Sequence, residues 1–142
     1  MIKLFTAAKA FIKFNGKILI LKESSKYKDG TNFGKFDVVG GRLKPGEKVL
    51  DSLIREIKEE TNLDVKIGKP FHVGEWFPKV NEEEWHVVGI FFECEANSDD
   101  VKISEDHESY EWINPKEYNK YNIIDNLKTA FEAYLEISKL LW

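Results

Sequence analysis

The feature that most constrains this fold is a change of hydrophobic period in the second quarter of the chain. Two β-type runs, residues 6–14 and 17–23, come first and are joined by Asn15-Gly16. That dipeptide is typical of tight hairpins because both of its positions tolerate a positive φ. From residue 48 to about residue 62 the period becomes 3.6, which predicts an amphipathic helix directly after the first strands.

Strand patterns resume after this helix. A polar loop and a short buried strand that ends on two glycines precede the helix, and the strands predicted after it are residues 64–77, 84–96 and 109–113. Asn114 and Pro115 are predicted to start a short helix, with Asn114 as its N-cap. A long amphipathic helix over residues 123–141 closes the chain. This order predicts one α/β or α+β domain over residues 1–142, a mixed β-sheet sandwiched by helices.

The helix predicted over residues 48–62 carries its apolar side chains at helical spacing. They are Leu50, Leu53, Ile54 and Ile57, at i, i+3, i+4 and i+7. We expect this face to pack on the sheet. Asn62 tolerates a left-handed backbone and is expected to end the helix.

The composition favours a globular protein of a reducing compartment. Apolar residues make up 42% of the 142 residues. The net charge of −4 argues against a protein that coats nucleic acid and against one that binds anionic membranes. Cys94 is the one cysteine and is expected to be a core residue. The sequence contains neither a signal-peptide pattern nor a run of about 20 apolar residues, so a cytoplasmic location without a membrane partner is expected.

Three glutamates crowd one side of the predicted helix. Glu56, Glu59 and Glu60 lie at i, i+3 and i+4, where like charges repel and weaken a helix. A hard divalent cation would neutralise such a cluster, and Mg²⁺ prefers carboxylate oxygen. The alternative is a solvated, glutamate-rich helix face that binds no ion.

Both arginines of the chain, Arg42 and Arg55, stand beside these carboxylates, whereas every other cationic side chain except histidine is a lysine. The planar guanidinium of Arg55 can hold a carboxylate by two parallel hydrogen bonds. Arg42 could touch a substrate phosphate or brace its loop. The glycines at 40 and 41 permit close backbone approach, and Pro45-Gly46 predicts a tight turn that brings Glu47 near the helix start.

The segment from Gly41 to Leu63 resembles the Nudix box, G-x5-E-x7-R-E-U-x-E-E-x-G-U, where U is a bulky aliphatic residue. Every position matches except Asn62, where the family has glycine. The resemblance implies an α/β/α sandwich that hydrolyses a nucleoside diphosphate linked to another moiety and requires Mg²⁺, or Mn²⁺ as a substitute. By matching positions, it implies metal ligands at Glu56, Glu59, Glu60 and the Gly41 carbonyl, and a catalytic set that includes Glu59, Arg55 and Glu47.

A general base outside the box is common in the family. Residues 104–112, SEDHESYEW, resemble a segment S-x-E-H-x-x-Y-x-W found in some Nudix proteins, with Asp106 where those have glutamate. Glu105, Asp106 and Glu108 are therefore candidates, and Glu108 is assigned to the catalytic set. Loop carboxylates of this kind are also common as solvated side chains with no role.

The sequence indicates the substrate only coarsely. Trp76, Phe77 and Trp85 flank one loop and could stack on a base, although packing in the core is the commoner role of such rings. With Arg42 they form the predicted substrate-binding set. Pro78, fifteen residues after Leu63, resembles the pattern of ADP-ribose pyrophosphatases. ADP-ribose or another nucleotide sugar, an ordinary or oxidised nucleoside triphosphate and a dinucleoside polyphosphate remain open.

The predicted partner is a small-molecule nucleotide; nucleic acid is not expected, and the protein would act as a monomer or a homodimer. Two other functions compete with catalysis. Nudix folds can serve as catalytically silent nucleotide-sensing or protein-binding modules, which usually have broken box acids. A plain structural domain would have no saturable site for divalent ions.

Overall fold

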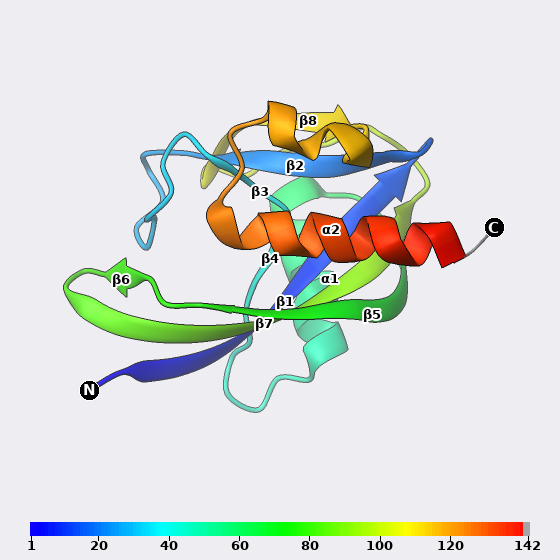
Figure 1. Ribbon diagram of the computed structural model, residues 1–142. Coiled ribbons are helices and arrows are strands. Elements are labelled where there is room, and N and C mark those ends of the chain that lie inside the picture. The colour runs from blue at the N-terminus through cyan, green and yellow to red at the C-terminus, as the bar shows by residue number, and fades with distance from the viewer. Residues whose placement is uncertain (141–142) are drawn as a thin grey trace.

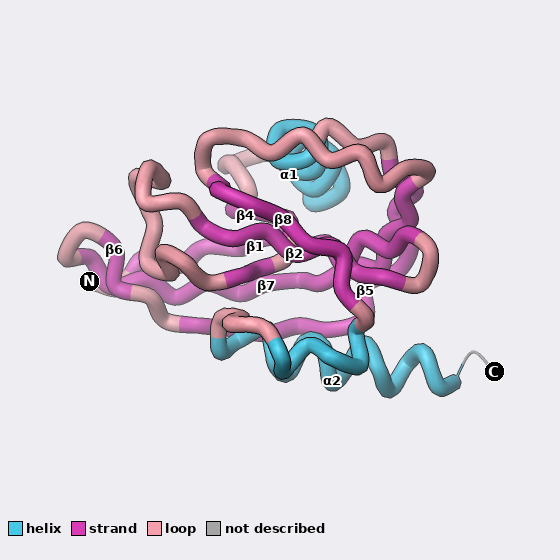
Figure 2. The backbone as a smooth tube through the Cα atoms, turned by 90° about the horizontal axis from the view of Figure 1, so that it is seen from above, coloured by secondary structure: helices cyan, strands magenta, loops and turns pink. Residues whose placement is uncertain are grey.

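A computed structural model describes residues 1–140 of the chain, which form a mixed β-sheet between two helices. The elements are β1 (Lys3–Phe14), β2 (Lys17–Glu23), β3 (Phe36–Asp37), β4 (Val39–Arg42), α1 (Val49–Thr61), β5 (Val65–Trp76), β6 (Lys79–Val80), β7 (Glu83–Ala96), β8 (His107–Ile113), a 3₁₀ helix (Pro115–Lys120) and α2 (Asp125–Leu140). Helices α1 and α2 cover opposite faces of the sheet (Figures 1 and 2). The expected α/β/α sandwich is confirmed.

The central strand of the sheet is β1. It pairs with different strands along its length, which separates two parts of the sheet beside it. The strand order is β3-β2-β1-β7-β5, with β1 and β7 parallel and the other pairs antiparallel. At residues 7–10 β1 pairs with β4, whereas it pairs with β2 only at residues 13–14. Strand β2 instead pairs along its length with β8. The β2–β3–β8 part of the sheet therefore diverges from the β1–β7–β5 part.

Two apolar clusters hold the layers together. Under α1, Leu53 and Ile57 pack with Ala8, Ala10 and Ile12 of β1. Under α2, the cluster is built on aromatic rings, including Phe11, Phe91 and Phe131. Successive side chains of β1 thus serve opposite faces, as a period of two requires. Cys94 is a buried free thiol within the first cluster, as expected.

Several local predictions are confirmed. Asn15 and Gly16 have positive φ in the β1–β2 hairpin, and Asn62 ends α1 in the left-handed region with φ 58°. The Asn114 side chain caps the 3₁₀ helix by accepting a hydrogen bond from the Lys116 N–H. Leu141, placed in the terminal helix by the sequence, lies outside the described residues.

Two of the four residues predicted to form the packed apolar face of α1 are exposed. Leu50 and Ile54 are 49% and 55% exposed, whereas Leu53 and Ile57 are buried. The remaining buried positions are polar: Ser52, Glu60 and Thr61. The helix therefore lies on the sheet along a narrow line, and the carboxylate of Glu60 falls on the packed face.

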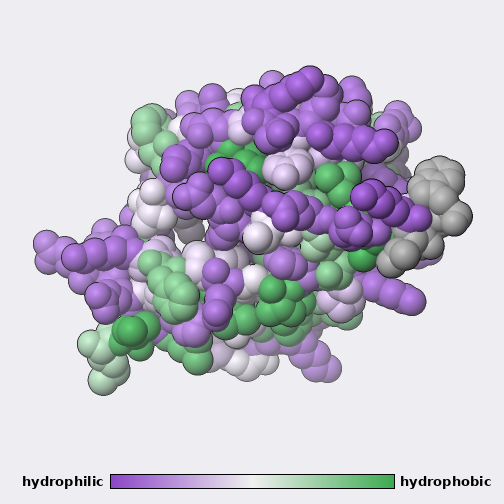
Figure 3. All heavy atoms as spheres, in the orientation of Figure 1, coloured by the Kyte–Doolittle hydropathy of each residue, from purple (hydrophilic) through white to green (hydrophobic). Residues whose placement is uncertain are grey.

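The surface is largely hydrophilic on the face shown in Figure 3, with hydrophobic patches among the charged side chains. Among residues 1–140, no helix is long and apolar enough to cross a membrane.

Candidate active site

A cavity of about 510 Å³ lies where the two parts of the sheet diverge. It is lined by residues of β1, β4 and β7, by residues of β2, β3 and β8, and by the loop over residues 24–35. Helix α1 contributes Arg55, Glu56 and Glu60. The cavity therefore brings the box helix together with segments far away in the sequence.

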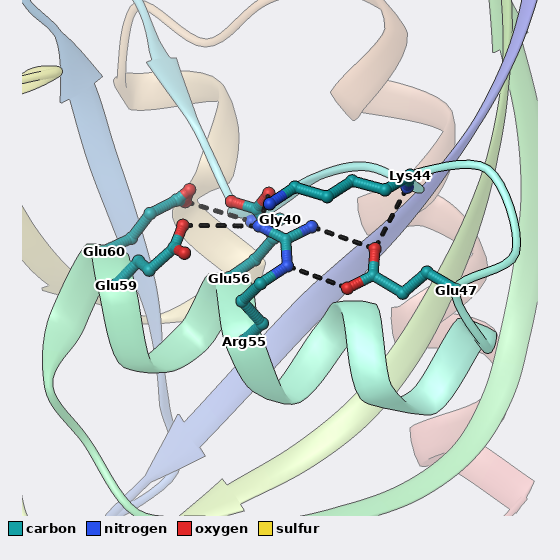
Figure 4. Close-up of polar contacts among 7 residues, drawn as sticks. All are labelled: Gly40, Lys44, Glu47, Arg55, Glu56, Glu59 and Glu60. Atoms are coloured by element: carbon teal, nitrogen blue, oxygen red, sulfur yellow. Dashed lines mark hydrogen bonds and ion pairs between the residues drawn. The ribbon is translucent and has the colours of Figure 1, made fainter.

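Two of the three clustered glutamates face this cavity. Glu60 is only 8% exposed, and its Oε1 accepts a hydrogen bond of 3.1 Å from the Gly40 N–H (Figure 4). The Glu56 carboxyl lies against Gly41, where an added Cβ would be 2.6 Å away, so any side chain at Gly41 would force that carboxyl to move. Burial raises the pKa of Glu56, and burial with repulsion from Glu56 raises the pKa of Glu60 well above its ordinary range.

Arg55 organises the carboxylates around it. Its Nε and one terminal nitrogen donate to the two oxygens of Glu47 at 2.8 and 3.0 Å, and the other terminal nitrogen donates to Glu56 at 3.0 Å (Figure 4). Glu47 is fixed further by the Lys44 N–H at 3.0 Å. The hydrogen bonds from Arg55 lower the pKa of Glu47 to about 2. The carboxylates of Glu47 and Glu56 in turn raise the pKa of Arg55.

Glu59 does not join Glu56 and Glu60 in the cavity. Its side chain is 57% exposed and bonds Arg55 at 3.3 Å. Accordingly, the described part of the chain holds no preformed group of three or more His, Cys, Asp or Glu side chains with metal-binding geometry. The donor set nevertheless suits a hard cation, because the buried carboxylate of Glu60 and the half-buried carboxylate of Glu56 line the same cavity beside the backbone of Gly40 and Gly41.

Lys9 of β1 is a cavity residue that the sequence reasoning missed. It is 7% exposed, and its Nζ donates to Asp37 Oδ2 at 2.8 Å. The available signal was a lysine in the middle of an otherwise apolar strand, TAAKAFI, which a period of two would place inside.

Arg42 braces the loop, one of the two roles considered for it. It donates to Asp29 Oδ2 at 2.7 Å, and its guanidinium lies over the rings of Phe5 and Trp85, at 4.9 and 4.4 Å from their centroids. It also lines the cavity. No local sequence signal connects Phe5 or Asp29 with Arg42, since each lies far along the chain from it.

The three aromatic candidates have different surroundings. Trp76 and Trp85 line the cavity, but Trp85 is 8% exposed and is covered by Arg42 and by Phe5, whose ring centroid is 4.6 Å away. Phe77 is 64% exposed, does not line the cavity and stacks on His86 at 4.5 Å.

The candidates around the start of β8 differ in whether they reach the cavity. Asp106 and His107 line it, whereas Glu105 and Glu108 do not, and all three carboxylates are exposed. Glu23 of β2, which the sequence analysis did not single out, lines the cavity and accepts a 3.0 Å hydrogen bond from the Asn32 N–H. Its partial burial raises its pKa.

Comparison with known proteins agrees with this architecture. The family model described as NUDIX domain matches residues 4–134. The chain is 26% identical over 100 residues to the nucleoside triphosphatase NudI of Escherichia coli O81 (strain ED1a), covering 63% of this chain and 69% of that protein. It is similar in structure to the MutT protein of Methanosarcina mazei Go1, with a TM-score of 0.83, 25% identity and 97% of each chain covered. A C. elegans Ap4A hydrolase has the same fold, with a TM-score of 0.72, 21% identity, and coverage of 95% of this chain and 98% of that one.

Proposed function

Because this chain belongs to the Nudix hydrolase family, we propose that it is a metal-dependent pyrophosphohydrolase of small nucleotides. The observation that carries the proposal is a single cavity lined both by the carboxylates of Glu56 and Glu60 and by the rings of Trp76 and Trp85. Carboxylates suit an ion that grips a polyphosphate, and aromatic rings suit a base or sugar.

The substrate we propose first is a nucleoside triphosphate, which water would cleave to a nucleoside monophosphate and pyrophosphate. The similarity to a nucleoside triphosphatase supports this order. A nucleotide sugar such as ADP-ribose comes second. A cavity of about 510 Å³ is within the range that encloses one compact ligand, which favours both over a dinucleoside polyphosphate.

Glu56, Glu60 and the Gly41 carbonyl would hold Mg²⁺, or Mn²⁺ in its place. Glu59 is the third proposed ligand; its exposed side chain is held by one hydrogen bond of 3.3 Å and is therefore the most able to change rotamer. When bound, such an ion neutralises phosphoryl oxygens and lowers the pKa of a coordinated water.

The other box residues position this ligand set. Arg55 is bonded to Glu56 and Glu59 and is itself anchored on Glu47 by two hydrogen bonds, so Glu47 and Arg55 act as orienting groups. For the proton of the attacking water, Asp106 is the proposed acceptor because it lines the cavity. Glu108, the residue favoured by the sequence, is the alternative.

Two residues are proposed to contact the nucleoside part. Trp76 offers a partly buried ring in the cavity, and Arg42 offers a guanidinium backed by Phe5 and Trp85. A guanidinium plane stacks on bases as aromatic rings do. Trp85 would then act by supporting Arg42, and the exposed Phe77 would contribute little.

The test is a panel of nucleoside triphosphates, nucleotide sugars and dinucleoside polyphosphates, assayed for phosphate-containing products with Mg²⁺, with Mn²⁺ and with EDTA. We expect turnover of at least one triphosphate, loss of turnover in EDTA, and loss of about 10²-fold or more in kcat for Glu60→Gln. Asp51→Asn is the matched control, because Asp51 is exposed on the same helix. Comparing Asp106→Asn with Glu108→Gln identifies the proton acceptor.

Two results would contradict the proposal. A folded protein that binds nucleotide but hydrolyses nothing on the panel would support the nucleotide-sensing module instead. A protein in which calorimetry detects no saturable Mn²⁺ binding, with or without nucleotide, would support a structural role.

A further inference from the structure

Lys9 and Glu60 are the two charged residues that are buried among those the structure describes, at 7% and 8% exposure. They have opposite charges and line the same cavity. Burying an isolated charge costs several kcal/mol, so buried charges occur where they are paired. Because Lys9 and Glu60 line one cavity, we expect their charges to compensate each other.

The backbone links Lys9 to the carboxylates through Gly40. Lys9 is the register partner of Gly40 in the β1–β4 pair, and the Gly40 N–H is the donor to Glu60. The Lys9 stem passes over Gly40, where an added Cβ would lie 3.0 Å from Lys9 Cδ. Because Gly40 has no side chain, the stem can cross there and the ammonium can reach the cavity.

Asp37 fixes the end of this stem. The Lys9 Nζ–Asp37 Oδ2 distance is 2.8 Å, and the other Asp37 oxygen accepts from the Val38 N–H at 2.7 Å. Burial alone would lower the pKa of Lys9, but Asp37, Glu60 and Glu56 outweigh it and raise that pKa. The ammonium is therefore charged at neutral pH and held at one place.

We propose that Lys9 is the internal counter-ion of the metal-binding carboxylates, held in position by Asp37. It offsets the repulsion between Glu56 and Glu60 before an ion arrives, and it weakens divalent-ion binding relative to the same site without it. This inference rests on the proposed function, because it assumes that these glutamates bind the ion. Lys9 is a positioning residue, since it acts through Glu60 and Glu56.

The test measures Mn²⁺ affinity of the metal-free full chain by calorimetry or by the paramagnetic signal of free Mn²⁺, without substrate. Lys9→Met keeps the length of the side chain and removes its charge. We expect it to bind Mn²⁺ about tenfold more tightly than the wild type, because one repelling charge is gone. Lys13→Met is the matched control, since Lys13 is exposed on the same strand, and its affinity should stay within about twofold.

A second comparison keeps the test valid if Lys9→Met leaves Asp37 unpaired and fails to fold. The double variant Lys9→Met/Asp37→Asn removes both members of the pair. It differs from Asp37→Asn only by the Lys9 charge, and should bind Mn²⁺ about tenfold more tightly than that single variant. Saturating Mn²⁺ should also raise the melting temperature more in variants without the Lys9 charge than in their partners.

Equal or weaker Mn²⁺ binding in both comparisons, with folded proteins, would overturn the counter-ion role and leave Lys9–Asp37 as a structural ion pair. Failure of the proposed function looks different: wild-type binding of Mn²⁺ would then be absent or unchanged by Glu60→Gln. Binding that depends on Glu60 but not on Lys9 sinks this inference alone.

Discussion

Replacing Glu60 with glutamine should make the metal-free protein more stable. Glu60 is 8% exposed, and burial together with the charge of Glu56 raises its pKa well above the ordinary value of 4.5. The ionised carboxylate therefore costs free energy in the folded state at neutral pH. Glutamine has the same shape, and its carbonyl oxygen can still accept the 3.1 Å hydrogen bond from the Gly40 N–H.

The expected gain in stability equals the part of the cost of the buried Glu60 charge that Lys9 does not offset. A buried neutral polar group with incomplete partners costs about 1–3 kcal/mol by protein mutational data; a buried charge costs more, but Lys9 offsets part of that cost for Glu60. We expect the free energy of unfolding in EDTA at pH 7.5 to rise by about 1–3 kcal/mol in Glu60→Gln. Urea unfolding followed by circular dichroism measures it. Glu59→Gln, at a side chain that is 57% exposed, should change it by less than about 0.5 kcal/mol.

The pH dependence gives a second check with a definite sign. A carboxyl whose pKa is higher in the folded than in the unfolded state binds its proton more tightly when folded. In the wild type, the free-energy cost of the ionised Glu60 carboxylate is therefore present above the pKa of the folded state. This cost is lost as the pH falls through that pKa toward the unfolded-state pKa of 4.5. The stability difference between the two proteins should shrink over that window. A Glu60→Gln protein no more stable than wild type at pH 7.5, or a difference that grows on acidification, would refute the reasoning.

The remaining predictions concern α1 and the glycine beside it. Leu53→Ala should lower the free energy of unfolding by about 2–5 kcal/mol, whereas Ile54→Ala, 55% exposed, should cost less than about 1 kcal/mol in the same urea assay. Gly40→Ala should lower the melting temperature, because φ is 144° and the new Cβ would lie 2.3 Å from a carbonyl oxygen of β1; an unchanged melting temperature would contradict that geometry. Arg55→Lys should raise the pKa of Glu47 from about 2 toward its ordinary range, as seen by NMR titration, and lower kcat, since lysine cannot replace the paired hydrogen bonds.

Much of the architecture was predictable because it depends on contacts between near neighbours. The Asn15-Gly16 hairpin, the left-handed end of α1 at Asn62 and the cap at Asn114 all follow from the backbone preferences of one or two residues. Most of the strand and helix order follows from hydrophobic period, but the single short strand predicted before α1 is two strands, β3 and β4, and the two-residue strand β6 was not predicted. The spacing of the box on α1 likewise places Arg55 within reach of Glu59, because residues one turn apart are neighbours.

The candidate site was predictable only as a set of residues. The sequence treats Glu59 and Glu60 as equivalent members of one cluster, but the structure buries Glu60 and exposes Glu59. Helical spacing fixes the angle between them by itself, whereas the rotation of α1 against the sheet depends on packing with β1 and β4. That rotation also exposes Leu50 and Ile54, which local amphipathicity had assigned to the core.

By itself, the sequence determined the order of the long strands and the helices, the left-handed end of α1, and which carboxylates share a helix with Arg55, since these depend on intervals of a few residues. Only the tertiary structure decided that Lys9 and Glu60 line one cavity, that Arg42 pairs with Asp29, and that Phe77 lies outside the cavity. These outcomes depend on where along β1 the neighbouring strand changes from β4 to β2. Such pairings join residues distant in the chain, and no local preference encodes which of them meet.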